Sequence, residues 1–191
     1  MSLIFKNNLE KFVTIDDQTF DQVLQYFEQR TYKKKQNLMQ QGDFCNDHYF
    51  VEQGCIRKFF LKANGVEQTT EFAIEQWWMT DNFAFENKTQ TTFNIQAIEP
   101  SRVLQISHER RVALLEEHPI MERYFRMVYQ RAYAASEKRI RFLYEFTREE
   151  LYFHFEHHYP EFVQRIPQYL LASFLGFTPE YLSEIRNKLR S

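Results

Sequence analysis

Cysteine and glycine are both scarce in this chain of 191 residues. Its two cysteines, Cys45 and Cys55, are too few for a disulfide scaffold or a four-cysteine iron–sulfur site. We therefore expect two ordinary thiols in a reducing compartment. The four glycines are not clustered, whereas phosphate-binding loops and dinucleotide fingerprints need grouped glycines. This argues against nucleotide-driven motors and NAD-dependent enzymes.

Long apolar runs and an excess of basic charge are also missing. No apolar stretch approaches membrane-spanning length, and Lys6, Asn7 and Asn8 directly follow Met1–Phe5, where a signal peptide would continue with apolar residues. We predict a cytoplasmic protein with no membrane partner. The net charge of -2 weighs against nucleic-acid binding unless basic charge is local. No paired catalytic carboxylates or nucleophile motif is recognisable, so no enzyme activity is expected.

Hydrophobic residues, at 43% of the chain, supply ample material for a packed core. Residues 9–29 have the apolar spacing of an amphipathic helix. Residues 56–63 and 66–74 resemble two strands joined by Asn64-Gly65, a strong hairpin signal. Further short strands are expected at residues 92–97 and 103–106. Closely spaced short strands predict an antiparallel roll or sandwich in the N-terminal half.

Residues 108–146 are predicted to be helical. After Pro119, spacings of four and three residues define a coiled-coil seam, which predicts a homodimer interface. The alternative is that this helix packs on its own domain. The seam positions are Met121, Phe125, Val128, Ala132, Ala135, Arg139, Phe142 and Phe146, of which Arg139 and Phe146 extend the pattern without being counted as interface.

The C-terminal segment has the pattern of a helix-turn-helix. Thr147 and Glu150 form a capping box that begins a new helix. A short helix is then expected over residues 167–175, Gly176 breaks it, and Thr178-Pro179 begins the next. A plain helical hairpin without a role in DNA binding is the alternative.

A second helix of this kind presents side chains to base edges in the major groove. Carboxylates could accept from cytosine amino groups, an asparagine could pair with adenine, and basic side chains would meet phosphates. The candidate DNA-binding residues are Gln168, Thr178, Glu180, Tyr181, Ser183, Glu184, Arg186, Asn187, Lys188 and Arg190.

Taken in order, these segments resemble the Crp/Fnr superfamily of bacterial regulators. The residues that carry the resemblance are Asn37-Leu-Met-Gln-Gln-Gly42, Tyr49-Phe-Val-Glu-Gln-Gly54, residues 97–107, and residues 166–189 with Gly176 and Glu180 in matching places. The resemblance implies an α+β fold with a β-roll sensor domain (1–117), a dimerisation helix (118–146) and a helix-turn-helix domain (147–191). It also implies a homodimer that binds DNA, acts with RNA polymerase and answers to a small-molecule effector.

The chain departs from the family pattern in three places. The phosphate cassette of cyclic-nucleotide binders corresponds here to Thr80, Asp81, Asn82, Thr91 and Thr92, which are the candidate effector-binding residues. Its arginine is missing and Asp81 would repel phosphate, so binding of cyclic AMP in the usual mode is not expected. The recognition helix has Pro179 and Glu184 where arginines are usual. The usual β-wing is not recognisable before Ser191, which predicts weaker affinity for DNA.

Two further groups have alternative interpretations. Trp77 and Trp78 could stack on a planar ligand or belong to the core. His154, His157 and His158 are interpreted as a polar face rather than a metal site, so no metal or other cofactor is expected beyond an effector of unknown identity. The alternative function for the whole chain is a ligand-sensing or protein-interaction module that no longer binds DNA.

Overall fold

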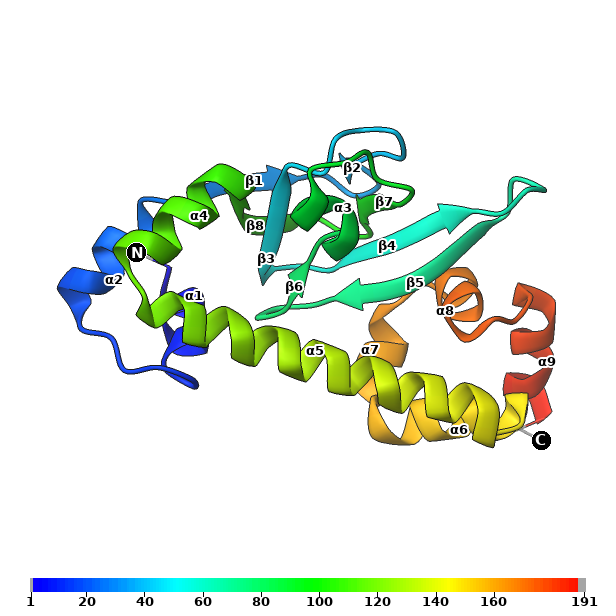
Figure 1. The fold of residues 1–191 in the computed structure, drawn as a ribbon. Helices are drawn as coiled ribbons and strands as arrows, with labels where there is room; N and C mark the ends of the chain where they lie inside the picture. Colours follow the sequence, from blue (N-terminus) through cyan, green and yellow to red (C-terminus); the bar gives the residue numbers. More distant parts are fainter. Residues whose placement is uncertain (1, 189–191) are drawn as a thin grey trace. The chain divides into compact units, whose positions relative to one another are not determined.

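A computed structural model describes residues 2–188 of the chain. Their contacts divide into two compact units. Unit 1 comprises Met1–Phe60 and Glu71–Arg131, and unit 2 comprises Leu61–Thr70 and Ala132–Ser191. The boundaries between the units fall within strands β4 and β5 and helix α5, which are labelled in Figure 1.

Two four-stranded antiparallel sheets form the strand-rich part, as predicted. One sheet has the order β1-β8-β3-β6 and the other the order β2-β7-β4-β5. Strands β3 and β8 pair antiparallel along most of their length, with His48 opposite Ile106. The strands are β1 (Glu28–Tyr32), β2 (Asn37–Met39), β3 (Asp47–Gln53), β4 (Ile56–Leu61), β5 (Glu67–Ala73), β6 (Trp78–Met79), β7 (Asn94–Ala97) and β8 (Ser101–Ser107).

The predicted hairpin is present between β4 and β5. Gly65 has a φ of 79°, in the left-handed region that favours glycine, and the backbone N–H of Lys62 donates to the carbonyl of Val66 at 2.9 Å. The Asn64 side chain accepts from the N–H of Val66 at 3.2 Å. The Asn-Gly pair was therefore a correct signal for this turn.

The single helix predicted over residues 9–29 is wrong. Helix α1 (Leu3–Leu9) ends at the first residue of this range, helix α2 (Asp17–Leu24) occupies only part of it, and β1 begins near its end. Asp16 begins α2 by accepting the N–H of Thr19 at 2.7 Å. The apolar periodicity misled the prediction because α2 and the preceding turn bury side chains in the same core, Phe20 and Val23 among them.

Unit 1 contains two clusters of buried hydrophobic residues. One cluster joins α1, α2 and the first part of α5 to a sheet and includes Phe5, Phe50 and Leu104. In it, the Tyr124 hydroxyl donates to the Asn8 Oδ1 at 2.6 Å and accepts from the Trp78 Nε1 at 2.8 Å. The other cluster lies within the roll and is formed by Met39, Cys45, Tyr49, Val51, Ile56, Ala73, Met79, Ala84, Phe85, Ile95, Ala97 and Val103.

Both cysteines are buried thiols, with exposures of 1% for Cys45 and 0% for Cys55. The turn before Cys55 requires glycine on two grounds. Gly54 has a φ of 96°, and a Cβ added there would lie 2.4 Å from the Ser101 Oγ and 2.7 Å from the Pro100 carbonyl oxygen. This close approach brings the β3–β4 turn against the start of β8.

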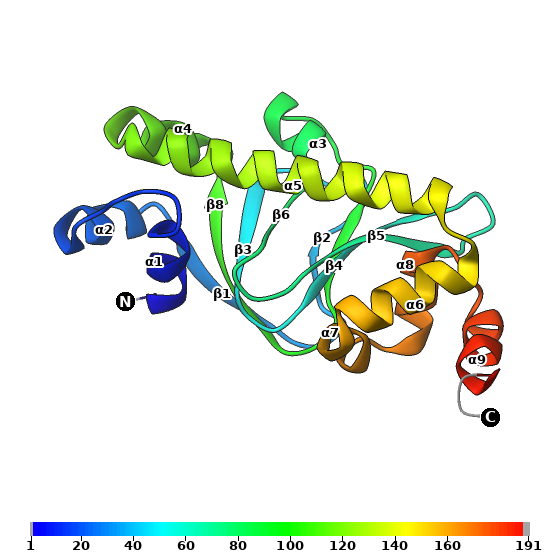
Figure 2. The same ribbon diagram turned by 90° about the horizontal axis from the view of Figure 1, so that it is seen from below.

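The helices after β8 begin and end close to the predicted helix boundaries. The helical stretch 108–146 is divided at His118-Pro119, and the Thr147 capping box is complete. Figure 2 shows α5 as one unbroken helix. The helices are α3 (Asn82–Asn87), α4 (His108–Glu117), α5 (Ile120–Glu145), α6 (Arg148–His158), α7 (Pro160–Arg165), α8 (Gln168–Leu175) and α9 (Pro179–Lys188). Among the residues described, no helix combines the length and apolar character needed to cross a membrane.

Candidate functional site

Helices α8 and α9 form the predicted pair of short helices around Gly176. This glycine has φ 79° and ψ 24°, and an added Cβ would meet nothing within 4 Å. Backbone conformation, rather than space, therefore favours glycine here. The N–H of Phe177 donates to the Ala172 carbonyl at 2.8 Å, and the Thr178 hydroxyl accepts the N–H of Tyr181 at 3.2 Å. The second helix thus begins at a capped N-terminus.

A small apolar core holds the two helices together. Leu171, Ala172 and Leu175 of α8 are buried, as are Leu182 and Ile185 of α9. The predicted phosphate contact Arg190 lies outside the described residues. Small Ala172 is fully buried, as expected where two helices cross closely.

Most predicted DNA-contacting side chains share the open surface of α9 or flank it. Exposed candidates are Gln168, Thr178, Glu180, Ser183, Glu184, Asn187 and Lys188. Tyr181 and Arg186 are half-buried, and Tyr181 packs against Phe177 at 5.6 Å between ring centroids. The Lys188 Nζ lies 3.3 Å from the Glu149 Oε1. The surface thus combines acceptors near the start of α9 with cations in its last turn.

The predicted effector residues separate into a buried group and an exposed pair. Thr80, Asp81 and Thr91 are buried, whereas Asn82 and Thr92 are exposed. Asp81 begins α3 by accepting the Ala84 N–H at 3.2 Å, and its other oxygen accepts the Thr91 hydroxyl at 2.8 Å. The Asp81 carboxylate is therefore held by the protein's own donors.

Lys58 is a buried cation that the sequence analysis did not identify. It is paired with Ile95 across β4 and β7 and is 6% exposed. Its Nζ donates to the Thr80 carbonyl at 3.1 Å and lies 2.9 Å from the Glu71 Oε1. The Phe93 ring centroid is 5.2 Å from the same nitrogen. An ammonium group therefore stands beside the cassette although the family's arginine is absent.

The alternation of β4 was the available signal for Lys58. Ile56 and Lys58 share one face of the strand because strand side chains alternate, and Ile56 belongs to the core of the roll. A lysine on the core face of a strand should have been noted, since lysine is rarely fully buried without a partner.

A second polar network in unit 1 joins α3, α4 and α5. The Arg111 guanidinium donates to the Glu86 Oε2 at 2.7 Å and to the Tyr129 hydroxyl at 2.8 Å. The burial of Tyr129 raises the pKa of its phenol to about 12. Beside this network, burial, together with Arg111 and Lys58, lowers the pKa of His48 to about 3. The His48 Nδ1 is buried and has no hydrogen-bond partner among the described atoms.

Trp77 and Trp78 have different surroundings. Trp78 packs against the core of unit 1, with ring centroids 5.2 Å from Phe50 and 4.5 Å from His48. Trp77 is 53% exposed. The core interpretation is therefore correct for Trp78, and the ligand-stacking interpretation remains a prediction for Trp77 alone.

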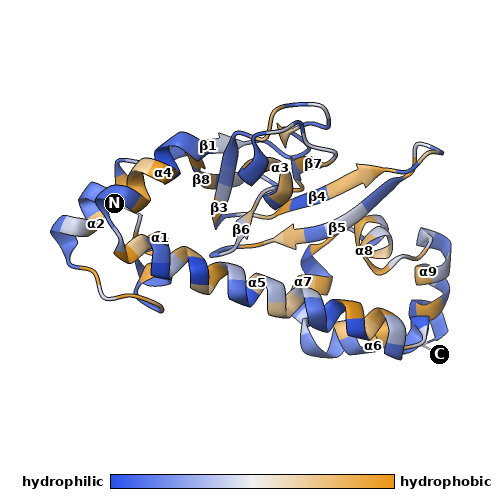
Figure 3. Cartoon of the chain, in the orientation of Figure 1, coloured by the Kyte–Doolittle hydropathy of each residue, from blue (hydrophilic) through white to orange (hydrophobic). Residues whose placement is uncertain are grey.

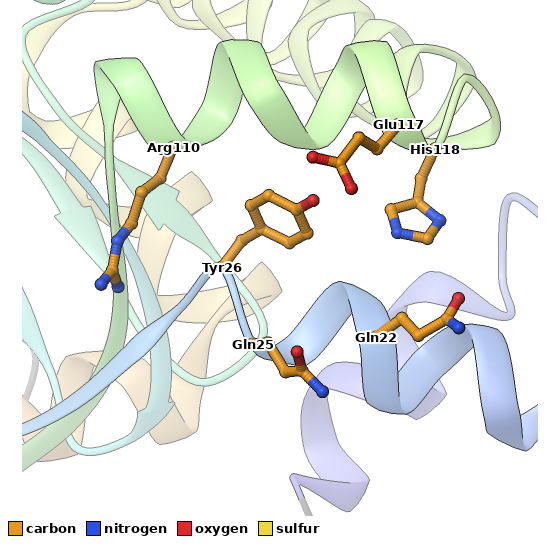
Figure 4. Close-up of a pocket in the computed structure, with 6 residues that line it drawn as sticks. All are labelled: Gln22, Gln25, Tyr26, Arg110, Glu117 and His118. Carbon is orange, nitrogen blue, oxygen red and sulfur yellow. The ribbon is translucent and has the colours of Figure 1, made fainter.

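An open pocket of about 640 Å³ lies between α2 and α4, away from the predicted effector residues. Figure 4 shows Tyr26 pointing toward Glu117, with His118 alongside. Hydrogen bonding to Glu117 raises the pKa of the Tyr26 phenol. The lining residues are Gln22, Gln25, Tyr26, Arg110, Glu117 and His118. None of the predicted effector residues contributes to this pocket.

The predicted dimer seam lies mainly on the face of α5 that packs inward. Met121 and Phe125 are 0% and 3% exposed in the core of unit 1, and Val128 packs against that core. The prediction that Met121 and Phe125 face a partner is therefore corrected, because the chain's own core covers them. Phe142 is half-buried and its ring lies 4.5 Å from His154. Ala132 and Ala135 are exposed.

A different face of α5 exposes large apolar side chains. Figure 3 shows hydrophobic positions recurring between hydrophilic ones along this helix. Tyr133, Ile140, Leu143 and Tyr144 are 67%, 53%, 50% and 89% exposed. Tyr133 and Ile140 are seven residues apart, and Leu143 and Tyr144 follow three and four residues later. Tyr133 and Ile140 therefore have heptad spacing on a face of α5 that differs from the predicted seam.

The three histidines of α6 do not form one solvated face. His154 is half-buried between the rings of Phe142 and Phe146, at 4.5 and 5.1 Å. Burial lowers the pKa of His154, with further contributions from His158 and His157. Over residues 2–188 the structure has no group of three or more His, Cys, Asp or Glu side chains arranged to hold a metal ion.

Comparison with known proteins bears on both parts of the chain. Residues 29–118 match the family model for the cyclic nucleotide-binding domain. No curated protein sequence matches the chain significantly.

Solved structures share the fold over most of the chain. FixK2 from Bradyrhizobium japonicum is 16% identical, with a TM-score of 0.70 over 86% of this chain and 84% of its own. The c-di-GMP-responsive regulator CLP of Xanthomonas campestris is 17% identical, with a TM-score of 0.68 over 92% of both chains. The catabolite activator protein of Thermus thermophilus is 19% identical, with a TM-score of 0.59 over 96% and 86%. Residues 29–118 are therefore similar to the cyclic nucleotide-binding domain, and the chain shares its fold with these solved regulators.

Proposed function

We propose that this protein is a dimeric, DNA-binding transcription regulator of the Crp/Fnr type. The observation that carries the proposal is the α8–Gly176–α9 pair, whose apolar face is buried while α9 keeps an open polar surface. Its combination with a cyclic nucleotide-binding-type domain supports the same function. The proposed divisions are a sensor domain (1–117), a dimerisation helix (118–146) and a DNA-binding domain (147–191).

In this proposal α9 enters the major groove. Glu180 and Glu184 would accept hydrogen bonds from cytosine amino groups, because carboxylates repel phosphates and are tolerated only at base edges. Lys188 would form an ion pair with a DNA phosphate in place of its ion pair with Glu149. The protein would act in the cytoplasm with RNA polymerase as a partner, and would have no enzyme activity.

We propose that the cassette does not take cyclic AMP in the usual mode. Asp81 places a carboxylate where a phosphate would bind, and it is already bonded to Thr91 and to the backbone of α3. Lys58 places a cation beside the cassette through its bond to the Thr80 carbonyl, but this cation is already paired with Glu71. Titration calorimetry with cyclic AMP should show no saturable heat. Saturable binding that Lys58→Met abolishes would contradict this reading.

We propose that the dimer forms through the stripe of Tyr133, Ile140, Leu143 and Tyr144. Apolar side chains this exposed at heptad spacing need a partner to cover them. Ile140→Glu should convert the dimer to a monomer in sedimentation experiments. Ala135→Glu is the matched control, since Ala135 lies about 140° from Ile140 around the helix. Dissociation by Ala135→Glu with none by Ile140→Glu would restore the original seam.

DNA binding is tested by selecting bound duplexes from a random-sequence pool at several salt concentrations. We expect enrichment of a palindrome with half-sites about one helical turn apart. Lys188→Ala should weaken binding to all sequences and reduce the salt slope by about one, whereas Glu184→Ala should change the preferred base at one position. Gln164→Ala, an exposed change on α7, is the control. No retention at low salt would refute the proposal.

The second candidate function is a sensing or protein-interaction module without DNA binding. Two observations favour it: the net charge is -2, and two carboxylates, Glu180 and Glu184, lie on the exposed surface of α9. Binding of a protein partner by α9 together with no DNA retention would support this alternative.

A further inference from the structure

The start of strand β5, in the β4–β5 hairpin, is hydrogen-bonded to one residue of α8. The Ser173 Oγ donates to the Glu67 carbonyl at 2.9 Å and accepts the N–H of Thr69 at 2.9 Å. Between these two, the Gln68 side-chain amide donates to the Ser173 carbonyl. Three successive hairpin residues therefore bond to a single serine more than 100 positions later in the sequence, all within unit 2.

Arg139 of α5 adds a second connection between the same elements. Its guanidinium donates to the Thr70 carbonyl and, at 2.9 Å, to the Phe174 carbonyl. The same group lies 3.9 Å from the centroid of the Phe174 ring. Arg139 thus joins α5, the hairpin and α8, and a planar guanidinium is suited to bridging two carbonyl oxygens.

These bonds reach α8 at its last turn, directly before Gly176. The last four carbonyls of a helix have no partner within the helix. The Ser173 carbonyl accepts from the Gly176 N–H within the cap and also from Gln68, and the Phe174 carbonyl accepts from Arg139. A positive charge at a helix C-terminus is also favourable to the helix dipole. The turn that sets the direction of α9 is therefore held partly by two side chains from outside the helix-turn-helix.

We infer that Glu67–Thr70, Arg139, Ser173 and Phe174 form a hairpin clamp that positions the helix-turn-helix and thereby regulates how α9 is presented. The regulatory part of this inference rests on the proposed DNA-binding function. Thr70, which bonds Arg139, directly precedes Glu71, the partner of Lys58 beside the cassette. An effector that takes Lys58 from Glu71 would act on the residue adjacent to the clamp in the same strand.

The test uses Ser173→Ala, Arg139→Ala, the conservative Ser173→Thr, and Gln164→Ala as control, all in the full chain. Hydrogen exchange is measured at the Thr69 amide and along α9. Ser173→Ala should accelerate exchange at Thr69 by roughly fivefold, the effect of losing one net hydrogen bond. Exchange in α9 should also accelerate, at unchanged protection in the core of unit 1, and Ser173→Thr should restore both.

Affinity for the selected duplex is measured in parallel. Ser173→Ala and Arg139→Ala should raise the dissociation constant by roughly fivefold for the same preferred sequence, because α9 is no longer pre-organised. Unchanged exchange at Thr69 or in α9 would overturn the clamp, and faster exchange with unchanged affinity would overturn its regulatory role. If the wild-type chain binds no DNA, the proposed function fails, while the exchange data still decide whether the clamp positions α9.

Discussion

The buried His48 predicts a specific loss of stability in mild acid. Its imidazole is 2% exposed and is surrounded by Trp78, Phe125 and Tyr129, with ring centroids at 4.5, 6.2 and 6.0 Å. Burial, together with the charges of Arg111 and Lys58, lowers its pKa to about 3 in the folded protein. The unfolded chain therefore binds the proton more tightly, and stability falls as the pH drops from about 6.5 toward about 3.

The magnitude at pH 5 depends almost entirely on the unfolded state. At pH 5 the solution is about 1.5 pH units below the pKa of an unfolded histidine, which is about 6.5. Protonation therefore stabilises the unfolded state by about 1.4 kcal/mol for each of these units. The folded histidine stays neutral at that pH. His48 alone should therefore lower the free energy of unfolding by about 2 kcal/mol between pH 7.5 and pH 5.

Urea unfolding of wild type, His48→Phe and His48→Leu at both pH values isolates this contribution. Both variants should lose about 2 kcal/mol less than wild type on acidification, whatever their stability at pH 7.5. Phe125→Leu is the control, since it disturbs the same aromatic group and removes no titratable side chain. An identical pH dependence in wild type and both His48 variants would refute the reasoning.

Three other features are tested by substitution, the first two of them by urea unfolding. Tyr124→Phe should cost about 2 kcal/mol, because both of the hydroxyl's buried partners lose a hydrogen bond; a neutral result would mean that water replaces the hydroxyl. Gly54→Ala should cost about 3 kcal/mol or more, against about 1 kcal/mol for Gly42→Ala, which shares a positive φ but has open space; equal costs would contradict the close approach. Gly176→Ala should cost about 1 kcal/mol and Gly176→Asn less, as measured by thermal unfolding; the reverse order would argue against the left-handed cap.

Local signals in the sequence identified several elements correctly. Asn64-Gly65 marked the hairpin, the Thr147 capping box marked the start of α6, and Gly176 with Thr178 marked the turn between α8 and α9. Each depends on the backbone conformation or hydrogen bonds of a few consecutive residues. Such signals can be read without knowing what packs against the segment.

Apolar periodicity was a weaker guide where several elements share one core. It merged α2 and the preceding turn into one helix, because both contribute apolar side chains to the same cluster. Along α5 it also assigned Met121 and Phe125 to the dimer seam, although both are covered by the chain's own core. A period shows that one face is buried, and not what buries it.

The sequence by itself therefore determined the order of the elements, their turns and caps, the roll class of the strand-rich half, and the helix-turn-helix, since these follow from local conformation and alternation. Only the tertiary structure decided that Lys58 lies beside the cassette, that Asp81 bonds Thr91, and that Ser173 is hydrogen-bonded to the start of β5. These contacts join residues distant in the chain. No local pattern encodes them, because they depend on which surfaces meet when the whole core packs.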